Sequence, residues 1–288
     1  MARPFLKWAG GKAKLAPAVV AAAPPSFSRY IEPFVGAGAV FFAFSEVRPT
    51  RAILNDANQE LIESFVVLRD SRAELVSALG RLSTRYLAAD QESRRAMYYE
   101  LRATEPASQV HRAARFLFLN KTCYNGLFRV NMRGGFNVPH GRYKQPRILD
   151  EALLESVSAA LQRAELRSED FANTCSTAAP GDFVYLDPPY HPLSATANFT
   201  GYTRADFGRA DQLRLRDAFE DLTRRGVAAM LSNSDHEFVR GLYSGLGYRI
   251  NTVSMSRAIN SKAAARQPIP ELLIDNFERV GAPPEREF

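Results

Sequence analysis

GDFVYLDPPY, at residues 181–190, has the pattern of a buried strand that stops abruptly at a polar turn. Branched and aromatic residues occupy positions 183–186, and an acid followed by two prolines ends the run. Proline has no N–H group and disfavours the helical region for the residue before it, so Asp187 and Pro188 should be extended. We therefore expect the Asp187 carboxylate, the Pro188 carbonyl and the Tyr190 ring to lie close together.

These three groups suit a planar amine as a ligand. Two acceptors can bind the hydrogens of an NH2 group while an aromatic face stacks on the attached ring. The exocyclic amine of adenine is a poor nucleophile because its lone pair is delocalised, and positive charge builds on the nitrogen as it attacks. Acceptors placed there favour the transition state over the ground state. The alternative is an ordinary strand and Pro-Pro turn in which Asp187 caps a helix.

A second strand-to-turn pattern lies upstream, at RYIEPFVGAG in residues 29–38, before a predicted helix from 39 to about 46. Gly36 and Gly38 would let the backbone approach a ligand at the carboxyl end of that strand. Residues 51–56 predict another strand, whose last residue, Asp56, lies about 20 residues past the first turn, where a carboxylate commonly binds ribose hydroxyls. These patterns predict an α/β sheet with an adenosyl ligand, while a plain βαβ turn would also explain the glycines.

Positive charge is concentrated in two segments that contain no acid. The net charge is +6, and a chain with 46% hydrophobic and 24% charged residues is an ordinary globular protein. The acid-free segments predict a polyanion as partner, and the alternative is a solvated basic face. Residues 106–149 carry Arg112, Arg115, Lys121, Arg129, Arg133, Arg142, Lys144 and Arg147, and residues 238–270 carry Arg240, Arg249, Arg257, Lys262 and Arg266.

Cysteine and histidine spacing gives no metal or disulfide signal. Cys123 and Cys175 form no CxxC pattern, and the four histidines show no ligand spacing. We therefore predict no metal and no disulfide framework. No apolar run reaches membrane-spanning length and no signal peptide opens the chain, which predicts a cytoplasmic protein without a membrane contact.

The remaining patterns predict an insertion within the α/β domain. Apolar spacing over residues 58–120 is helical, and residues 120–139 combine short β runs with Asn-Gly and Gly-Gly pairs, as in a hairpin. The expected domains are a catalytic one, residues 1–57 and 148–288, and a recognition insertion, residues 58–147. The catalytic part should continue with a helix at 147–164, a strand at 165–171, a loop over the site at 194–202, a helix at 206–225, a strand at 227–232, a helix from 235, and strands at 248–253 and 271–277.

Six stretches in this order resemble Dam-type DNA adenine-N6 methyltransferases of the D12 class, whose cofactor motif precedes and whose Asp-Pro-Pro-Tyr motif follows the recognition region. They are FLKWAGGK from residue 5, EPFVGAG from 32, YNGLFRVN from 124, GGFNVPHGRYKQP from 134, DPPYHPLSATANFTGY from 187 and LSNSD from 231. The resemblance covers nearly the whole chain. Phe128, His140 and the segment 261–269 depart from the commonest family pattern, which bears on phosphate contacts and flanking preference more than on the chemistry.

The resemblance implies a Rossmann-like class I methyltransferase sheet, mostly parallel, with one antiparallel strand near its C-terminal edge. It also implies S-adenosyl-L-methionine as the methyl donor and a monomer that acts on double-stranded DNA in a bacterium or a phage-infected cell. By motif match, the cofactor contacts would be Trp8, Lys12, Phe34, Gly36, Gly38, Asp56, Phe171 and Asp187.

The same resemblance assigns the DNA contacts. Asp187, Pro188 and Tyr190 would be the catalytic residues, holding a target adenine that is flipped out of the duplex. The residues that match intercalating or base-reading positions, and that imply GATC as the site, are Lys7, Tyr124, Asn125, Leu127 and Arg129, and the basic segment adds Arg142 as a phosphate contact. The alternatives are a different DNA site, an RNA or protein amine, or a non-enzymatic DNA-binding module. Enzymes for other amines commonly place Asn or Ser where Asp187 stands here.

Overall fold

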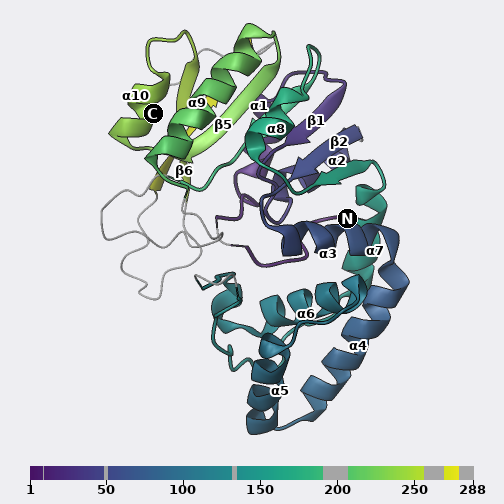
Figure 1. Ribbon diagram of the computed structural model, residues 1–288. Helices are drawn as coiled ribbons and strands as arrows, with labels where there is room; N and C mark the ends of the chain where they lie inside the picture. Colours follow the sequence, from purple (N-terminus) through teal and green to yellow (C-terminus); the bar gives the residue numbers. More distant parts are fainter. Residues whose placement is uncertain (9, 49–50, 132–134, 191–206, 256–268, 279–288) are drawn as a thin grey trace.

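A sheet forms the centre of the protein in this computed structural model, which describes residues 1–8, 10–48, 51–131, 135–190, 207–255 and 269–278 (Figure 1). Within these residues the sheet has seven strands, in the order β3-β2-β1-β4-β5-β7-β6. The strands are β1 (Arg29–Glu32), β2 (Arg51–Asn55), β3 (Ala164–Arg167), β4 (Phe183–Leu186), β5 (Ala228–Ser234), β6 (Arg249–Met255) and β7 (Ile269–Asp275).

The direction of the strands divides the sheet into two parts. Strands β1 to β5 run parallel to one another, whereas β7 is antiparallel to both β5 and β6. This arrangement confirms the mostly parallel sheet with one antiparallel strand near its C-terminal edge. The chain continues from β1 to β2 and β3 on one side, and β4 and β5 lie on the other. The carboxyl ends of β1 and β4 therefore border the change in strand order where open α/β sheets bind ligands.

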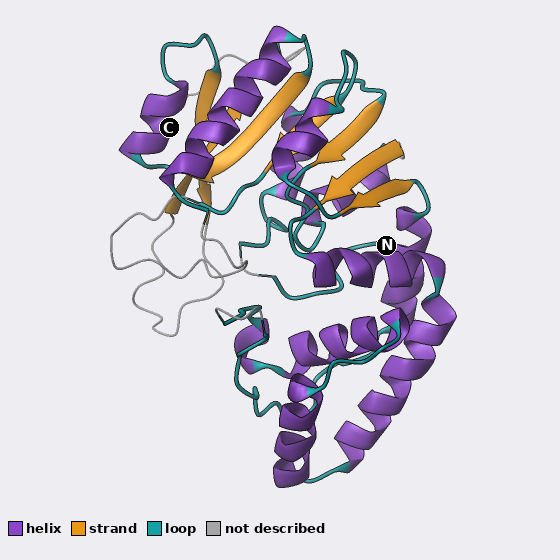
Figure 2. Cartoon of the chain, viewed as in Figure 1, coloured by secondary structure: helices purple, strands orange, loops and turns teal. Residues whose placement is uncertain are grey.

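Helices cover both faces of the sheet (Figure 2). Successive strand residues point to opposite faces. Tyr30 and Tyr185 pack with helices α1 (Ala16–Ala22), α2 (Ala39–Val47), α3 (Gln59–Asp70) and α7 (Glu151–Leu161). Ile31 and Val184 pack with α8 (Phe171–Ser176), α9 (Arg209–Arg224) and α10 (Glu237–Tyr243). Because both faces are buried, the inner strands are continuous apolar runs rather than alternating ones.

The helices α4 (Arg72–Ala88), α5 (Gln91–Ala103) and α6 (Gln109–Thr122) extend away from the sheet (Figure 1). Side chains begin two of them: Asp90 accepts a hydrogen bond from Ser93 N at 2.8 Å, and Ser108 accepts one from His111 N at 3.2 Å. Helix α3 contacts α6 and α4 as well as α7 and β3. The insertion boundary at residue 58 therefore stays a prediction, because α3 packs against both parts of the molecule.

Most expected elements of the catalytic part shift by one to three residues in the structure, and two differ more. Helix α7 begins at Glu151 rather than at 147, because Asp150 Oδ1 accepts a hydrogen bond from Leu153 N at 3.3 Å and caps the first turn. At its other end, Ala164 already pairs with Ala52 in the sheet. The strand expected at 165–171 ends at Arg167, since Asp170 caps α8. The loop predicted at 194–202 and the basic segment at 256–268 lie outside the described residues.

Across the described ranges, no helix combines the length and apolar character needed to cross a membrane. Nor do those ranges contain a group of three or more His, Cys, Asp or Glu residues placed to hold a metal ion. Cys123 and Cys175 are both buried free thiols.

Candidate active site at the carboxyl ends of the strands

Three residues from distant parts of the sequence meet just beyond the carboxyl end of β4. Lys12 Nζ lies 3.1 Å from Asp187 Oδ1 and 4.3 Å from the centre of the Tyr190 ring. It also donates a hydrogen bond to the carbonyl of Gly10 at 3.0 Å. The Lys12 and Asp187 side chains are only 9% and 16% exposed, so water screens this ion pair weakly. The Asp187 carboxylate thus pairs with Lys12 and caps none of the described helices.

The surroundings of Asp187 act on its pKa in opposite directions. Burial raises the pKa of the Asp187 carboxyl above its usual value, and this is the largest influence. The ammonium of Lys12 and the hydroxyl of Ser232 both lower the pKa, because they stabilise the ionised form. The carboxylate is therefore held as an acceptor in a largely dry environment.

Polar residues of neighbouring elements hold the turn from Asp187 to Tyr190 in place. Ser232 donates to Asp187 Oδ1 at 2.8 Å, and the Tyr190 hydroxyl donates to Glu271 Oε2 at 2.9 Å. The carbonyl of Pro189 accepts a hydrogen bond from Gln212 Nε2 at 3.1 Å, and Gln212 Oε1 in turn accepts one from Asn233 at 3.0 Å. Sequence reasoning assigned no role to Ser232, Asn233, Gln212 or Glu271. The available signal was the polar run LSNSD at the end of a buried strand.

The glycine turn after β1 lies beside Asp56, as the sequence predicts. Asp56 accepts hydrogen bonds from Gly36 N at 3.1 Å and from Asn58 N at 2.9 Å. Burial raises the pKa of Asp56 to about 6, although both of these bonds favour the charged form. Gly36 has a φ of +48°, and a Cβ there would lie 3.0 Å from Trp8 Cδ1. Only glycine therefore allows the indole of Trp8 to lie over this turn.

Aromatic rings form one wall next to the glycine turn. The rings of Phe34 and Phe171 lie 5.1 Å apart, and the ring of Phe207 is 5.7 Å from Phe34 and 5.9 Å from Phe171. The guanidinium of Arg214 lies 5.0 Å from the Phe171 ring. An adenosyl group needs apolar faces for its base and a carboxylate for its ribose, and these rings together with Asp56 supply both. The residues present therefore fit the cofactor that the sequence implies.

The residues predicted to read DNA lie around a short 3-10 turn, η1 (Tyr124–Gly126), that follows α6. Tyr124 is 51% exposed, and Asn125 takes a left-handed conformation with φ of 55°. Backbone hydrogen bonds tie this turn to the chain at 139–141, from Tyr124 N to Pro139 O and from Gly141 N to Thr122 O, each at 2.8 Å. The exposed side chains of Tyr124 and Asn125 thus project from a backbone that is hydrogen-bonded to residues 139–141.

Residues 127–139, which we call the recognition hairpin, follow that turn. Val130 and Phe136 form an antiparallel bridge, and Asn137 N donates to Arg129 O at 3.0 Å. These contacts support only part of the hairpin predicted at 120–139: residues 120–122 end α6, residues 124–126 form η1, and the described residues after them form an isolated bridge rather than strands. Leu127 is half-buried and Arg129 is exposed. Arg129 Nε donates to Asn137 Oδ1 at 2.7 Å, which holds the guanidinium over the neighbouring arm.

The N-terminal segment connects the recognition hairpin to the cofactor side. The backbone N–H and carbonyl of Lys7 bond to the side chain of Asn120 at 2.9 and 2.7 Å. The exposed Lys7 side chain covers Gly126, where any Cβ would collide with it. The indole of Trp8 stacks on Phe128 with centroids 5.2 Å apart and planes 23° apart. One short segment therefore contacts both the glycine turn and the hairpin.

The two point departures from the family pattern are both buried. Phe128 is the stacking partner of Trp8. His140 lies behind the exposed turn, with Nε2 2.5 Å from the Tyr86 hydroxyl. Burial lowers the pKa of His140, and nearby Arg142, Arg95 and Arg94 lower it further. A neutral His140 therefore serves the packing of the insertion.

The basic segment at 106–149 divides into internal and exposed side chains. Arg112 pairs with Glu63, its Nε lying 2.9 Å from Oε2. Arg115 is 8% exposed and donates to the carbonyls of Leu101 and Arg102, each at 2.8 Å. These two arginines join helices within the insertion, so the prediction that they serve a polyanion is wrong. Side chains that the structure leaves exposed are Arg129, Arg142, Lys144 and Arg147.

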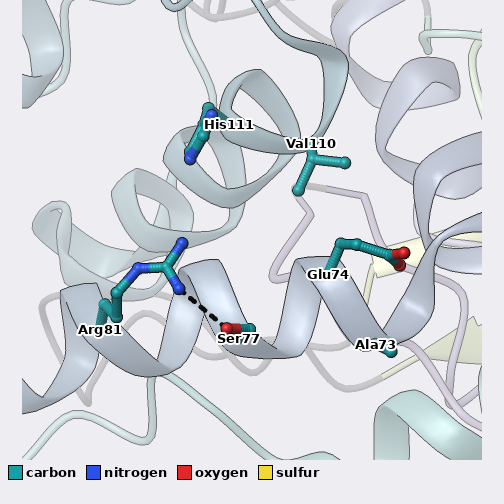
Figure 3. Close-up of a pocket in the computed structure, with 6 residues that line it drawn as sticks. All are labelled: Ala73, Glu74, Ser77, Arg81, Val110 and His111. Carbon is teal, nitrogen blue, oxygen red and sulfur yellow. Dashed lines mark hydrogen bonds between the residues drawn. The ribbon is translucent and has the colours of Figure 1, made fainter.

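A hollow elsewhere in the insertion lies apart from these residues (Figure 3). Its lining comes from α4 and α6, and Arg81 donates a hydrogen bond to Ser77 one turn earlier on α4, at 2.8 Å. It contains none of the acceptors gathered at the strand ends, so it is not the active site.

The sheet, its glycine turn and the acid-proline-proline-tyrosine end of β4 have the architecture of Rossmann-like methyltransferases. Residues 8–259 match the family model for D12 class N6 adenine-specific DNA methyltransferases, and the chain belongs to this family. It is therefore an adenine-N6 DNA methyltransferase, for which the family implies S-adenosylmethionine as methyl donor.

Curated relatives align over almost the full length. The type II methyltransferase M.MjaIII of Methanocaldococcus jannaschii is 41% identical over 288 residues, covering 96% of this chain and 99% of that protein. The type II methyltransferase M1.LlaDCHI of Lactococcus lactis subsp. cremoris is 39% identical, covering 96% and 95%. The DNA adenine methylase of Escherichia coli K12 is 38% identical, covering 94% of each chain.

Proposed function

We propose that one copy of this chain methylates N6 of adenine within GATC sites of double-stranded DNA, after rotating the base out of the duplex. The observation that carries the proposal is the convergence of Lys12, Asp187 and Tyr190 at the carboxyl end of β4. Lys12 is buried and Asp187 is only 16% exposed, so a base stacked within a duplex would not reach them, and the target adenine would leave the duplex to meet them.

The proposed chemistry follows from the acceptors around the amine. The Asp187 carboxylate and the Pro188 carbonyl accept the two amine hydrogens, while the Tyr190 ring stacks on the base. S-adenosylmethionine, when bound, supplies an electrophilic methyl group. Positive charge grows on N6 as it attacks, and a carboxylate already in place stabilises this charge without reorganising. The neighbouring Lys12 favours the ionised form of Asp187, and so opposes the effect of burial, which raises the pKa of that carboxyl.

The cofactor is proposed to lie between the glycine turn and the aromatic wall. Gly36 and Gly38 would let the backbone approach the methionine part, next to Trp8 and Lys12. Asp56 would bind the ribose hydroxyls, since each carboxylate oxygen can accept a second hydrogen bond beside its backbone donor. Phe34 and Phe171 would contact the adenine of the cofactor.

Recognition of GATC is proposed for the insertion, residues 58–147, together with Lys7. Exposed Tyr124 and Asn125 would fill the gap left by a flipped base, and Lys7, Leu127 and Arg129 would read base edges. Arg142 is exposed directly after residues 139–141, whose backbone bonds to the chain around η1, and it would contact phosphate. The packing of Lys7 against Gly126 supports a shared reading surface.

The test uses plasmid DNA that lacks adenine methylation. After incubation with the protein and S-adenosylmethionine, total N6-methyladenine is counted by mass spectrometry, and methyl-sensitive endonucleases report which sites changed. We expect modification confined to GATC. N6-methyladenine at other sites would overturn the site assignment while leaving the roles of Asp187 and its neighbours. A duplex that stays unmodified while single strands are methylated would overturn the duplex substrate.

A further inference from the structure

Ser232 lies between a buried tyrosine and the proposed catalytic carboxylate. It is fully buried on β5, and its Oγ donates to Asp187 Oδ1 at 2.8 Å. The hydroxyl of Tyr185, also fully buried, lies 2.9 Å from the same Oγ. Ser232 has one proton, which it gives to Asp187, so Tyr185 must be the donor in the second bond. The order of donation therefore runs from Tyr185 to Ser232 to Asp187.

The register of the sheet explains why these three side chains meet. Strands β4 and β5 are parallel, with Leu186 opposite Leu231, so the next residues along, Asp187 and Ser232, are cross-strand neighbours. Asp187 follows the last residue of β4, two residues after Tyr185, and both side chains reach the Ser232 hydroxyl. The chain of hydroxyls is thus built by rigid sheet elements rather than by a loop.

These bonds restrict how the carboxylate can rotate. The contacts from Ser232 and from Lys12, at 2.8 and 3.1 Å, both go to Oδ1. Rotating Asp187 away would leave the buried Ser232 hydroxyl without its acceptor and the buried Lys12 ammonium without its counter-charge, with only the Gly10 carbonyl left to accept from Lys12. Both losses are costly in a buried site. The neighbouring Asn233 secures the backbone of the same turn through Gln212 and Pro189.

We propose that Ser232, itself held by Tyr185, is a positioning residue that fixes the orientation of the Asp187 carboxylate toward the adenine amine. The proposal rests on the proposed role of Asp187 in holding that amine. A carboxylate held in one orientation does not have to rearrange when charge develops on N6, so it adds nothing to the free-energy barrier.

The Ser232 hydroxyl also favours the charged form of Asp187. Burial raises the pKa of Asp187, and the Ser232 donor is one of the groups that lower it. Loss of that donor raises the pKa again, so the acidic limb of the rate-against-pH profile moves to higher pH. The titratable groups that interact electrostatically with Asp187 are Lys12, Tyr30, Glu32, Tyr185, Tyr190 and Glu271, and all of them except Tyr185 are kept in every variant below.

The experiment separates positioning from packing by changing both hydroxyls. Ser232→Ala alone leaves the Tyr185 hydroxyl buried without its partner, which lowers the unfolding temperature. The double variant Tyr185→Phe/Ser232→Ala removes both polar partners, and such paired removal is nearly neutral for stability. Tyr185→Phe alone keeps the hydrogen bond from Ser232 to Asp187. Ser64→Ala is the matched control, because Ser64 is another fully buried serine whose hydroxyl bonds only the carbonyl of Leu61, at 2.6 Å.

Unfolding temperature, DNA affinity, and single-turnover methylation counted as total N6-methyladenine are measured for each protein. We expect the double variant to recover most of the wild-type unfolding temperature and DNA affinity, yet to methylate at least about tenfold more slowly. Its acidic limb should lie at higher pH than that of the wild type. Tyr185→Phe should lose less rate than Ser232→Ala, and Ser64→Ala should keep the wild-type rate.

Two outcomes would overturn the proposal. One is a double variant with wild-type rate and pH profile. The other is an equal loss of rate in Tyr185→Phe and Ser232→Ala, which would indicate a packing effect. The readout counts N6-methyladenine at any sequence, so a wrong site assignment leaves the test intact. A wild type that makes no N6-methyladenine would instead refute the proposed function.

Discussion

The carboxyl ends of the strands and the recognition hairpin use polar residues in opposite ways. At the strand ends, Lys12 and Ser232 are buried, Asp187 is 16% exposed, and the three side chains satisfy one another. On the hairpin side, Tyr124 and Arg129 are exposed on a backbone that is itself well fixed. Catalysis gains from charges held in a dry, preorganised place, whereas reading a duplex needs side chains that can reach outward. The difference predicts that changes in the two regions affect different measurements.

The largest expected effect comes from Asp187→Ala. Removal of the proposed amine acceptor should lower single-turnover methylation by about 100-fold or more, because charge on N6 would develop without its partner. Affinity for a duplex, measured by fluorescence anisotropy, should stay close to wild type. Equal loss of rate and of DNA affinity would break the division between the two regions.

A control for this variant lies at the opposite end of the same strand. Asp182 is buried and accepts a hydrogen bond from Arg29 Nε at 3.0 Å. Asp182→Asn should therefore lower the unfolding temperature while the folded fraction keeps its rate. That contrast would show that the lower methylation rate of Asp187→Ala comes from the position of Asp187, and not merely from the loss of an acid in the interior of the protein.

The next effect in size is expected for Arg129→Ala. An arginine that reads a base edge contributes about 1 to 3 kcal/mol of discrimination, so the variant should accept substitutions at one base pair of the site. Competition between duplexes that differ at single positions measures this directly. If specificity is unchanged, the recognition hairpin does not read the site, and only the catalytic half of the comparison stands.

The smallest expected effects concern two arginines of residues 106–149, the exposed Arg142 and the buried Arg115. Arg142→Ala should weaken binding to all duplexes alike and make the salt dependence of affinity shallower by about one released ion. Arg115→Ala should leave that slope unchanged and lower the free energy of unfolding by about 1.5 to 3 kcal/mol, because its buried hydrogen bonds are lost. Salt titrations and denaturant unfolding of both variants give the result, and a changed slope in Arg115→Ala would contradict the internal role.

Much of the fold and of the site followed from local patterns. The apolar run before Asp187, the glycines after β1 and the acid after β2 each mark the carboxyl end of a parallel strand, so the sequence places them on one edge of the sheet. The meeting of Lys12 with Asp187 and Tyr190, and of Asp56 with Gly36, agrees with that expectation. Their roles toward cofactor and DNA stay predictions.

Long-range pairing is what local patterns could not give. Ser232 and Glu271 look like ordinary polar residues near strand ends, and only the register of β4, β5 and β7 brings them to Asp187 and Tyr190. The same reason made the charge of residues 106–149 misleading. In the sequence, Arg112 and Arg115 look like surface cations because no acid stands near them along the chain. In the structure they pair with Glu63 and Glu60, which lie in α3.

The position of Trp8 gives the molecule a built-in optical reporter. The sequence has one tryptophan, and its indole lies over the Gly36 turn and stacks on Phe128 of the recognition hairpin. Light emitted by a single indole at this junction depends on both neighbours at once. Unlabelled protein should therefore signal the arrival of a cofactor and the arrival of DNA through one emission band, without any attached dye.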